Sequence, residues 1–327
     1  MRIVDRNVPL TRYSGPMDHG LGLSEIKAGF GSGNPIARSQ LWVTLRDFLN
    51  LQGISPADIT GSKGVLLEGS EITSLILSEA LDYFYRALYN FYAQDKLVEY
   101  GYSTWSHVTN YYSSYFSIHA LLRVQGRSLT RIWRKQTDDG RISGQAYYIF
   151  PFDFINHQYV ICTNYQSAGH HYPAWHIFYV IYRNFSFSPS EFEKIFKRRN
   201  VDSEFEELEF RVQQNYEPWQ GFSEIWNPQV IPDLIANYTR LSQCEDDKEI
   251  ETLSRLTTDP DYRFYARSVL RILFCQSILR EICATNQSLL NCLDQRKNDV
   301  ISFIRNVTPR EIANSVINRL PSLMNLT

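Results

Sequence analysis

Apolar residues recur at helical spacing in two long stretches of the chain. From residue 71 to 93, and again from 104 to 122, apolar positions step by four and three in alternation. This stepping places apolar side chains along one face of a helix. Gly101 and Tyr102 separate the two stretches, and Gly126 follows the second. We therefore expect two antiparallel helices joined by a tight turn. Their apolar faces comprise Leu77, Leu81, Phe84, Leu88 and Phe91 in the first helix, and Val108, Tyr111, Tyr115, Ile118 and Leu122 in the second.

A different pattern follows residue 140. The segment 140–182 is rich in β-branched and aromatic residues and is bounded by glycine and proline, which predicts strands. The stretch 176–187 is a candidate for one further strand. Residues 1–35 show little periodicity and many glycines and prolines, so we expect an irregular arm there. A helix is expected over 36–51, followed by a turn-rich connector to residue 70.

Helical signals return in the second half of the chain. Ser188, Pro189 and Glu191 form a helix-start pattern, which Thr308 to Glu311 repeat near the C-terminus. The stretch 262–284 is apolar around much of a helical circumference and predicts a central helix. We interpret the acidic run 204–209 as the solvated face of a helix.

These patterns predict a mainly α protein in four successive parts. An N-terminal arm and helix would occupy 1–69, and the first half of a helical bundle 70–140. A β-rich aromatic insertion would occupy 141–187. The second half of the bundle, with the C-terminal helices, would occupy 188–327.

The composition limits the function classes. The 327 residues carry a net charge of −2 and are 43% apolar and 21% charged, as in an ordinary globular protein. A chain-wide positive field of the kind that drives non-specific binding to nucleic acid is therefore excluded. Aromatic residues are abundant, at 14%, so we expect a bulky core in which tyrosine hydroxyls need partners.

The cysteines and the apolar runs bear on the compartment. The five cysteines are an odd number without paired spacing, so we expect free thiols in a reducing compartment. The sequence has neither a signal-peptide pattern nor an apolar run of roughly 18 residues. We expect a cytoplasmic protein with no membrane partner.

Several common catalytic and binding motifs do not occur. The sequence has no phosphate-binding loop, no serine nucleophile elbow and no zinc-protease motif. His170, His171 and His176 lie close together, but they lack the cysteine pairs or the helical ligand spacing of a zinc site. We expect no metal and no cofactor.

The second predicted helix carries the most informative constellation. Beside its apolar face, Tyr112, Phe116, His119 and Arg123 follow the same stepping and form a neighbouring stripe. His119 and Arg123 are one turn apart and could present donors to a phosphate or a base. Alternatively, His119 is hydrogen-bonded at the edge of the core, and Tyr112 packs under the β-rich segment.

This helix resembles the second helix of HEPN domains, which are four- or five-helix bundles of prokaryotic defence and toxin–antitoxin systems. The resemblance rests on Tyr111-Tyr112, on Ala120 before the paired leucines, and on the closing glycine. Farther along, Arg211, Asn215 and Tyr216 resemble the family's Arg-x-x-x-Asp-Tyr signature, with asparagine in place of the acid. The resemblance covers 71–126 and, more loosely, 188–285.

The resemblance implies either a binding role or ribonuclease chemistry. Many members cleave RNA with an arginine followed after four to six residues by a histidine. The one match here, Arg12 to His19, spans Pro16 and lies outside the predicted bundle. We therefore expect a non-catalytic component of a bacterial defence or toxin–antitoxin complex that binds a partner protein or a nucleotide. RNA and a second copy of the chain are further candidate partners. The candidate binding residues are Tyr111, Tyr112, Phe116, His119, Arg123, Arg211, Asn215 and Tyr216.

Two alternatives stay open. The first is a divergent, metal-independent ribonuclease that uses His119 with Arg123 or Arg211. The second is a nucleic-acid-binding scaffold with a short basic run, although basic residues also suit the end of a helix. That run comprises Lys194, Lys197, Arg198 and Arg199.

Overall fold

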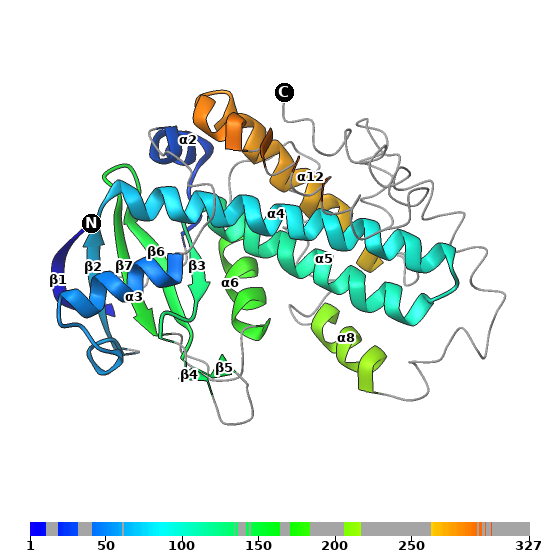
Figure 1. The fold of residues 1–327 in the computed structure, drawn as a ribbon, viewed down its shortest axis with the longest axis horizontal. Coiled ribbons are helices and arrows are strands. Elements are labelled where there is room, and N and C mark those ends of the chain that lie inside the picture. The colour runs from blue at the N-terminus through cyan, green and yellow to red at the C-terminus, as the bar shows by residue number, and fades with distance from the viewer. Residues whose placement is uncertain are drawn as a thin grey trace. The chain divides into compact units, whose positions relative to one another are not determined.

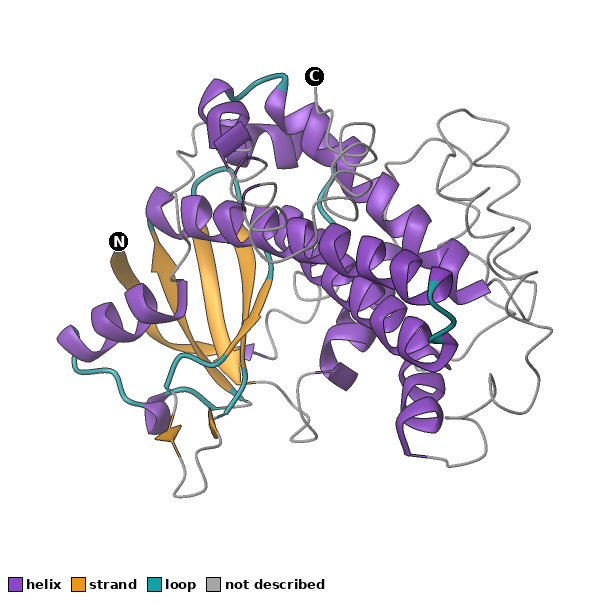
Figure 2. Ribbon diagram, turned by 45° about the vertical axis from the view of Figure 1, so that its right-hand side comes forward, coloured by secondary structure: helices purple, strands orange, loops and turns teal. Residues whose placement is uncertain are grey.

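A computed structural model describes most of the chain and shows a mainly helical protein with a small antiparallel sheet (Figures 1 and 2). The described residues are 1–10, 19–31, 41–60, 62–133, 135–136, 142–143, 145–163, 171–183, 206–216, 263–292, 294–295, 298 and 302. Two compact units interleave along the chain. The first comprises Met1–Asp82, His119–Ser186 and Glu281–Cys292, and the second Tyr83–Ile118, Phe187–Arg280 and Leu293–Thr327.

The first unit contains a five-stranded antiparallel sheet with the strand order β1-β2-β7-β6-β3. A separate pair, β4 and β5, is two residues long in each strand. The strands are β1 (Arg2–Pro9), β2 (Lys63–Glu68), β3 (Ser128–Thr130), β4 (Lys135–Gln136), β5 (Ile142–Ser143), β6 (Tyr147–Asp153) and β7 (Gln158–Thr163). The helices of this unit include α2 (Leu23–Gly31), α3 (Leu41–Leu51), the short 3-10 helix η2 (Pro56–Asp58) and α6 (His171–Arg183).

The sheet corrects two expectations from the sequence. Residues 2–9 form strand β1 and 23–31 form α2, so these parts of the N-terminal segment are not irregular. The strands after residue 140 are not a separate insertion, because β7 pairs with β2, which precedes the helical hairpin. Periodicity reports only local neighbours, and strand pairing across about 90 residues leaves no local signal.

Residues 176–183 of the candidate strand 176–187 belong to helix α6 (His171–Arg183), so this part of that prediction is wrong. Trp175, Phe178 and Tyr182 are buried in it at steps of three and four. Burial of that face overrides a strand propensity that is itself context-dependent. The strands β6 and β7 form as predicted, and Tyr147–Pro151 and Tyr159–Thr163 are buried throughout.

The two predicted helices and their turn are confirmed as α4 (Ser70–Glu99) and α5 (Ser103–Val124). Each ends in a glycine with positive φ, at Gly101 and Gly126. The N–H of Tyr102 donates to Leu97 O at 2.8 Å, and that of Arg127 donates to Leu122 O at 2.9 Å. This arrangement is the Schellman motif, which satisfies carbonyls at a helix end. It explains why both helices stop where they do.

In the second unit, residues 83–99 of α4 and 103–118 of α5 are accompanied by α8 (Glu206–Tyr216) and α12 (Arg263–Cys283). Ser113 Oγ donates to Ala87 O at 2.9 Å, which links α5 to α4. The central helix expected over 262–284 is confirmed as α12, whose apolar residues other than Leu273 are buried. The helix starts expected at Ser188 and Thr308 lie outside the described residues.

We predict that two left-handed glycines respond differently to alanine. Both Gly53 after α3 and Gly126 after α5 have φ near 70°, but a Cβ at Gly53 meets nothing within 4 Å, whereas one at Gly126 would lie 2.6 Å from the Phe154 ring. Gly53→Ala should lower the free energy of unfolding by about 1 kcal/mol, from backbone strain alone. Gly126→Ala should lower it by about 2–5 kcal/mol, because overpacking adds to that strain. Urea unfolding of both variants would measure the difference, and equal losses would contradict the packing argument.

Candidate functional site

His119 and Arg123 lie in the interior of the first unit, with 3% and 1% of their surfaces exposed. The guanidinium of Arg123 donates from both Nε and Nη2 to Glu79 Oε2 at 2.8 Å. Its Nη1 lies 3.0 Å from His119 Nδ1 and donates to His119 O at 3.2 Å. Ser128 Oγ completes the cluster, 3.2 Å from Arg123 Nη2 and 3.3 Å from Glu79 Oε2. A guanidinium is always a donor, so Nδ1 of His119 is the acceptor and carries no proton.

The cluster corrects the expectation of an accessible flank at these two positions. Arg123 is charged and buried, and Glu79 neutralises it from α4. His119 is the hydrogen-bonded histidine of the alternative interpretation. The four-three stepping of α5 identifies a stripe, but it does not say that a carboxylate on α4 faces that stripe.

In the second unit, Arg211 lies against the paired tyrosines. Its guanidinium carbon is 5.5 Å from the Tyr111 ring centroid and 5.6 Å from that of Tyr112. Its Nη2 donates to the Tyr112 hydroxyl at 3.1 Å. Phe116 packs beside Tyr112, with ring centroids 6.1 Å apart. Four of the predicted binding residues therefore meet here through cation–π and aromatic contacts.

The remaining predicted residues fall elsewhere. Asn215 and Tyr216 belong to α8, but their side chains lie outside what the structure describes. The basic residues Lys194, Lys197, Arg198 and Arg199 also lie outside the described residues.

A buried ion pair between α8 and α12 was not predicted. Glu207 Oε1 lies 2.6 Å from Arg271 Nη1, and both side chains are buried. Ser114 Oγ of α5 donates to Glu207 Oε2 at 2.7 Å and also contacts Arg271. The acidic run therefore does not lie on a solvated face at Glu207. The adjacent Glu206 pairs with Arg267 at 3.1 Å.

One sequence signal could have located this pair. Polar residues recur on α5 at helical steps, and all of them are buried. A polar stripe in a buried helix requires polar partners, and α12 supplies two of them, Arg271 to Ser114 and Ser268 to Ser113. The stripe comprises Ser106, Asn110, Ser113, Ser114 and Ser117.

Three large aromatic side chains are exposed at the turn between α4 and α5. Tyr100, Tyr102 and Trp105 have 60%, 56% and 60% of their surfaces accessible. The turn itself is fixed by the Schellman motif at Gly101 and by the bond from Ser106 N–H to Tyr102 O at 2.9 Å. We name these three residues the aromatic tip. Tyr102 lies in the predicted turn and Trp105 at the start of the second predicted helix, but their exposure is visible only in the structure.

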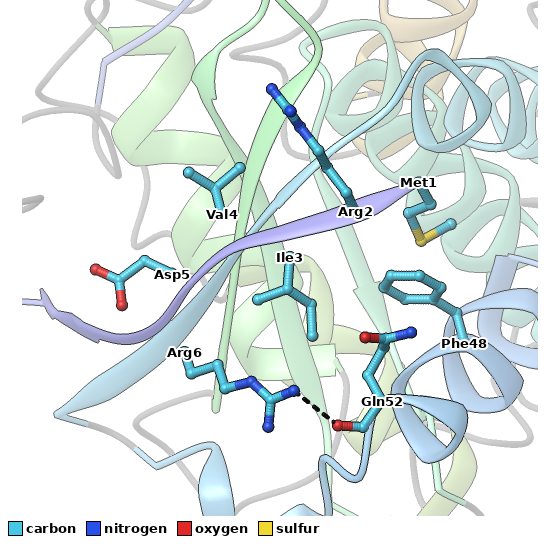
Figure 3. A pocket seen from close by; sticks show the side chains of 8 residues that line it. All are labelled: Met1, Arg2, Ile3, Val4, Asp5, Arg6, Phe48 and Gln52. Carbon is cyan, nitrogen blue, oxygen red and sulfur yellow. Dashed lines mark hydrogen bonds between the residues drawn. The ribbon is translucent and has the colours of Figure 1, made fainter.

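A pocket of about 380 Å³ lies in the first unit, between β1 and the C-terminal turn of α3. Figure 3 shows Ile3 and Arg6 on the same side of the strand as Phe48 of α3 and Gln52, which follows that helix. Arg6 donates to Gln52 O at 3.0 Å. Two register shifts break the pairing of β1 with β2. Such irregularities and the charged side chains protect an edge strand from pairing with other chains.

A second pocket, of about 570 Å³, lies beside the turn between β6 and β7. Its apolar wall includes Phe152, Phe154 and Ile155, and Glu25 and Asp153 bring carboxylates to it. The buried guanidinium of Arg127 also lines this pocket and donates to the Tyr148 hydroxyl at 3.0 Å. Both signs of charge thus meet the same apolar wall, so the lining selects no single class of ligand.

Within the described ranges, no group of three or more histidine, cysteine or acidic side chains could hold a metal ion. No described helix is both long and apolar enough to span a bilayer. Burial raises the pKa of the Cys162 thiol to about 12 and raises that of Cys275 further, so neither thiol is a nucleophile at neutral pH.

Comparison with protein-family models, curated proteins and solved structures finds no match to this chain.

We predict that the cluster around Arg123 is structural. Glu79→Leu should lower the free energy of unfolding by about 3–5 kcal/mol, because it leaves a buried guanidinium without a counter-charge. The double variant Glu79→Leu with Arg123→Met should recover much of that loss, since it removes both charges. Chemical unfolding of the two variants beside the wild-type protein measures the recovery. A double variant no more stable than Glu79→Leu would contradict the assignment.

Proposed function

We propose that the chain is a non-catalytic binding component that docks a partner protein through the aromatic tip. The observation that carries this proposal is the exposure of Tyr100, Tyr102 and Trp105 within six residues of one fixed turn. Tyrosine and tryptophan bury large areas at a small entropic cost, and they are enriched at the energetic centres of protein interfaces. A monomer gains nothing from keeping three such side chains in water.

The shape of the aromatic tip indicates the shape of its partner. The turn projects from the ends of two helices, and the hydrogen bonds at Leu97 and Tyr102 hold its backbone in one conformation. A preformed convex surface loses little entropy on binding. The partner should therefore offer a concave, mostly apolar pocket with polar groups at its rim for the tyrosine hydroxyls.

The biological setting of the proposal comes from the HEPN-like helices. Tyr111, Tyr112 and Arg211, which carry the resemblance, lie together in the second unit. We place the protein in a prokaryotic defence or toxin–antitoxin complex on that resemblance. The burial of His119 and Arg123 supports a binding role over the ribonuclease alternative, because a catalytic group must reach its substrate.

Co-purification with the products of the adjacent genes tests the proposal. We expect one product to bind, and we expect Tyr102→Ser or Trp105→Ser to weaken its affinity by about 30-fold or more, as at an interface hot spot. Tyr89→Ser is the matched control, since Tyr89 is an exposed tyrosine of α4 outside the tip. Equal binding by wild-type protein and both tip variants, or the absence of any partner among those products, would refute the proposal.

A cleavage assay separates the binding role from the ribonuclease alternative. Prolonged incubation of the purified protein with single-stranded RNA should leave the RNA intact. Cleavage that disappears in His119→Ala, with the fold preserved by circular dichroism, would instead establish the nuclease.

A further inference from the structure

Two arginines and a serine hydroxyl form one buried polar cluster in the second unit. Arg267 and Arg271 lie one turn apart on α12, and Ser114 faces them from α5. Ser113 and Ser268 join the same two helices through a hydrogen bond of 3.0 Å between their hydroxyls. Guanidinium groups beside hydroxyl donors are the set that proteins use to bind a phosphate group.

The carboxylates of α8 fill this cluster. Glu207 places one oxygen 2.6 Å from Arg271 Nη1 and the other 2.7 Å from Ser114 Oγ. Glu206 places an oxygen 3.1 Å from Arg267 Nη1. Two adjacent acidic residues at the start of one helix therefore present oxygens to both arginines and to the hydroxyl, as the oxygens of a phosphate group would.

Polar and cation–π contacts link α8 to α5 and α12. They include the ion pairs of Glu206 and Glu207, the hydrogen bond from Ser114 to Glu207, and the stacking of Arg211 on Tyr111 and Tyr112. A buried ion pair adds little net stability, because desolvation of both charges offsets their attraction. A competing anion can therefore replace these carboxylates at a small net cost.

We infer that α8 is an internal mimic of a phosphate-bearing ligand and covers a phosphate site made of Arg267, Arg271 and Ser114. A diphosphate or a nucleic-acid backbone would bind the cluster and displace the two carboxylates. In the displaced state the two guanidiniums keep their charge pairing through the ligand. This site stands independently of the aromatic tip, so that either can fail without the other.

The fraction of molecules in which α8 is displaced determines how much the affinity for a phosphate ligand should change. The ligand binds only the displaced state, so its apparent affinity falls with the fraction of molecules in which α8 is displaced. Neutralising Glu207 weakens the hold of α8 and raises that fraction. We expect Glu207→Gln to bind pyrophosphate or single-stranded RNA about tenfold more tightly than the wild-type protein.

Titration calorimetry with pyrophosphate and fluorescence anisotropy with a labelled uridine oligonucleotide provide the two arms. A gain for pyrophosphate alone identifies a small phosphate ligand, and a gain for the oligonucleotide identifies a nucleic acid. Glu209→Gln is the matched control, because Glu209 lies exposed in the same first turn of α8. Adding Arg271→Gln to Glu207→Gln should abolish the gain.

Hydrogen exchange at the backbone amides of α8 measures the displacement of this helix directly. Saturating the wild-type protein with the probe that binds should raise exchange at the backbone amides of 206–216. If Glu207→Gln does not fold, Glu206→Gln takes its place, since Glu206 is the more accessible of the two. Affinity unchanged in the folded variant, a gain that survives Arg271→Gln, or exchange unaltered by the probe would overturn the inference.

Discussion

A charge removed from water must be paired or hydrogen-bonded where it lies, and one buried ion pair in each unit meets this requirement. Arg123 is almost fully buried and takes Glu79 as its counter-charge. Arg271 is buried in the second unit and takes Glu207. In each case the carboxylate comes from a different helix, so that the pair ties two helices together in one relative position. Desolvation makes either partner alone costly, and this cost restricts which helix faces can meet.

The same requirement places the four residues of the predicted binding stripe on α5 in two different environments. His119 and Arg123 satisfy one another and Glu79 inside the first unit. Tyr112 and Phe116, earlier on the same helix, associate with Arg211 and with other aromatic rings in the second unit. A helix that passes from one unit to the other thus has a stripe with two different environments. Its regular spacing gives no indication of where the environment changes.

The sequence allowed prediction of those elements whose signals are local. The helices α4, α5 and α12 have apolar spacing or apolar content over 20 residues or more, and glycines with positive φ end α4 and α5. Strand β1 was not predicted, because residues 4–7 are all exposed and the strand therefore lacks alternating apolar and polar positions. Helix α6 was not predicted because most of its buried residues are β-branched or aromatic types that favour strands, as are Trp175, Phe178, Ile181 and Tyr182. The site was harder to predict, since Glu79 and Glu207 acquire their roles only when helices distant in sequence meet.

The pairing of β2 with β7 has a consequence for the order in which the protein is made. During synthesis β2 emerges well before its partner strand, and the whole helical hairpin is completed in between. Residues 281–292 of the first unit follow α8 and most of α12 of the second. Segments of the two units are therefore synthesised in alternation. Neither unit can complete its fold before much of the other has been translated. Exposed strand edges must survive that interval, which makes β2 a segment that a chaperone would protect.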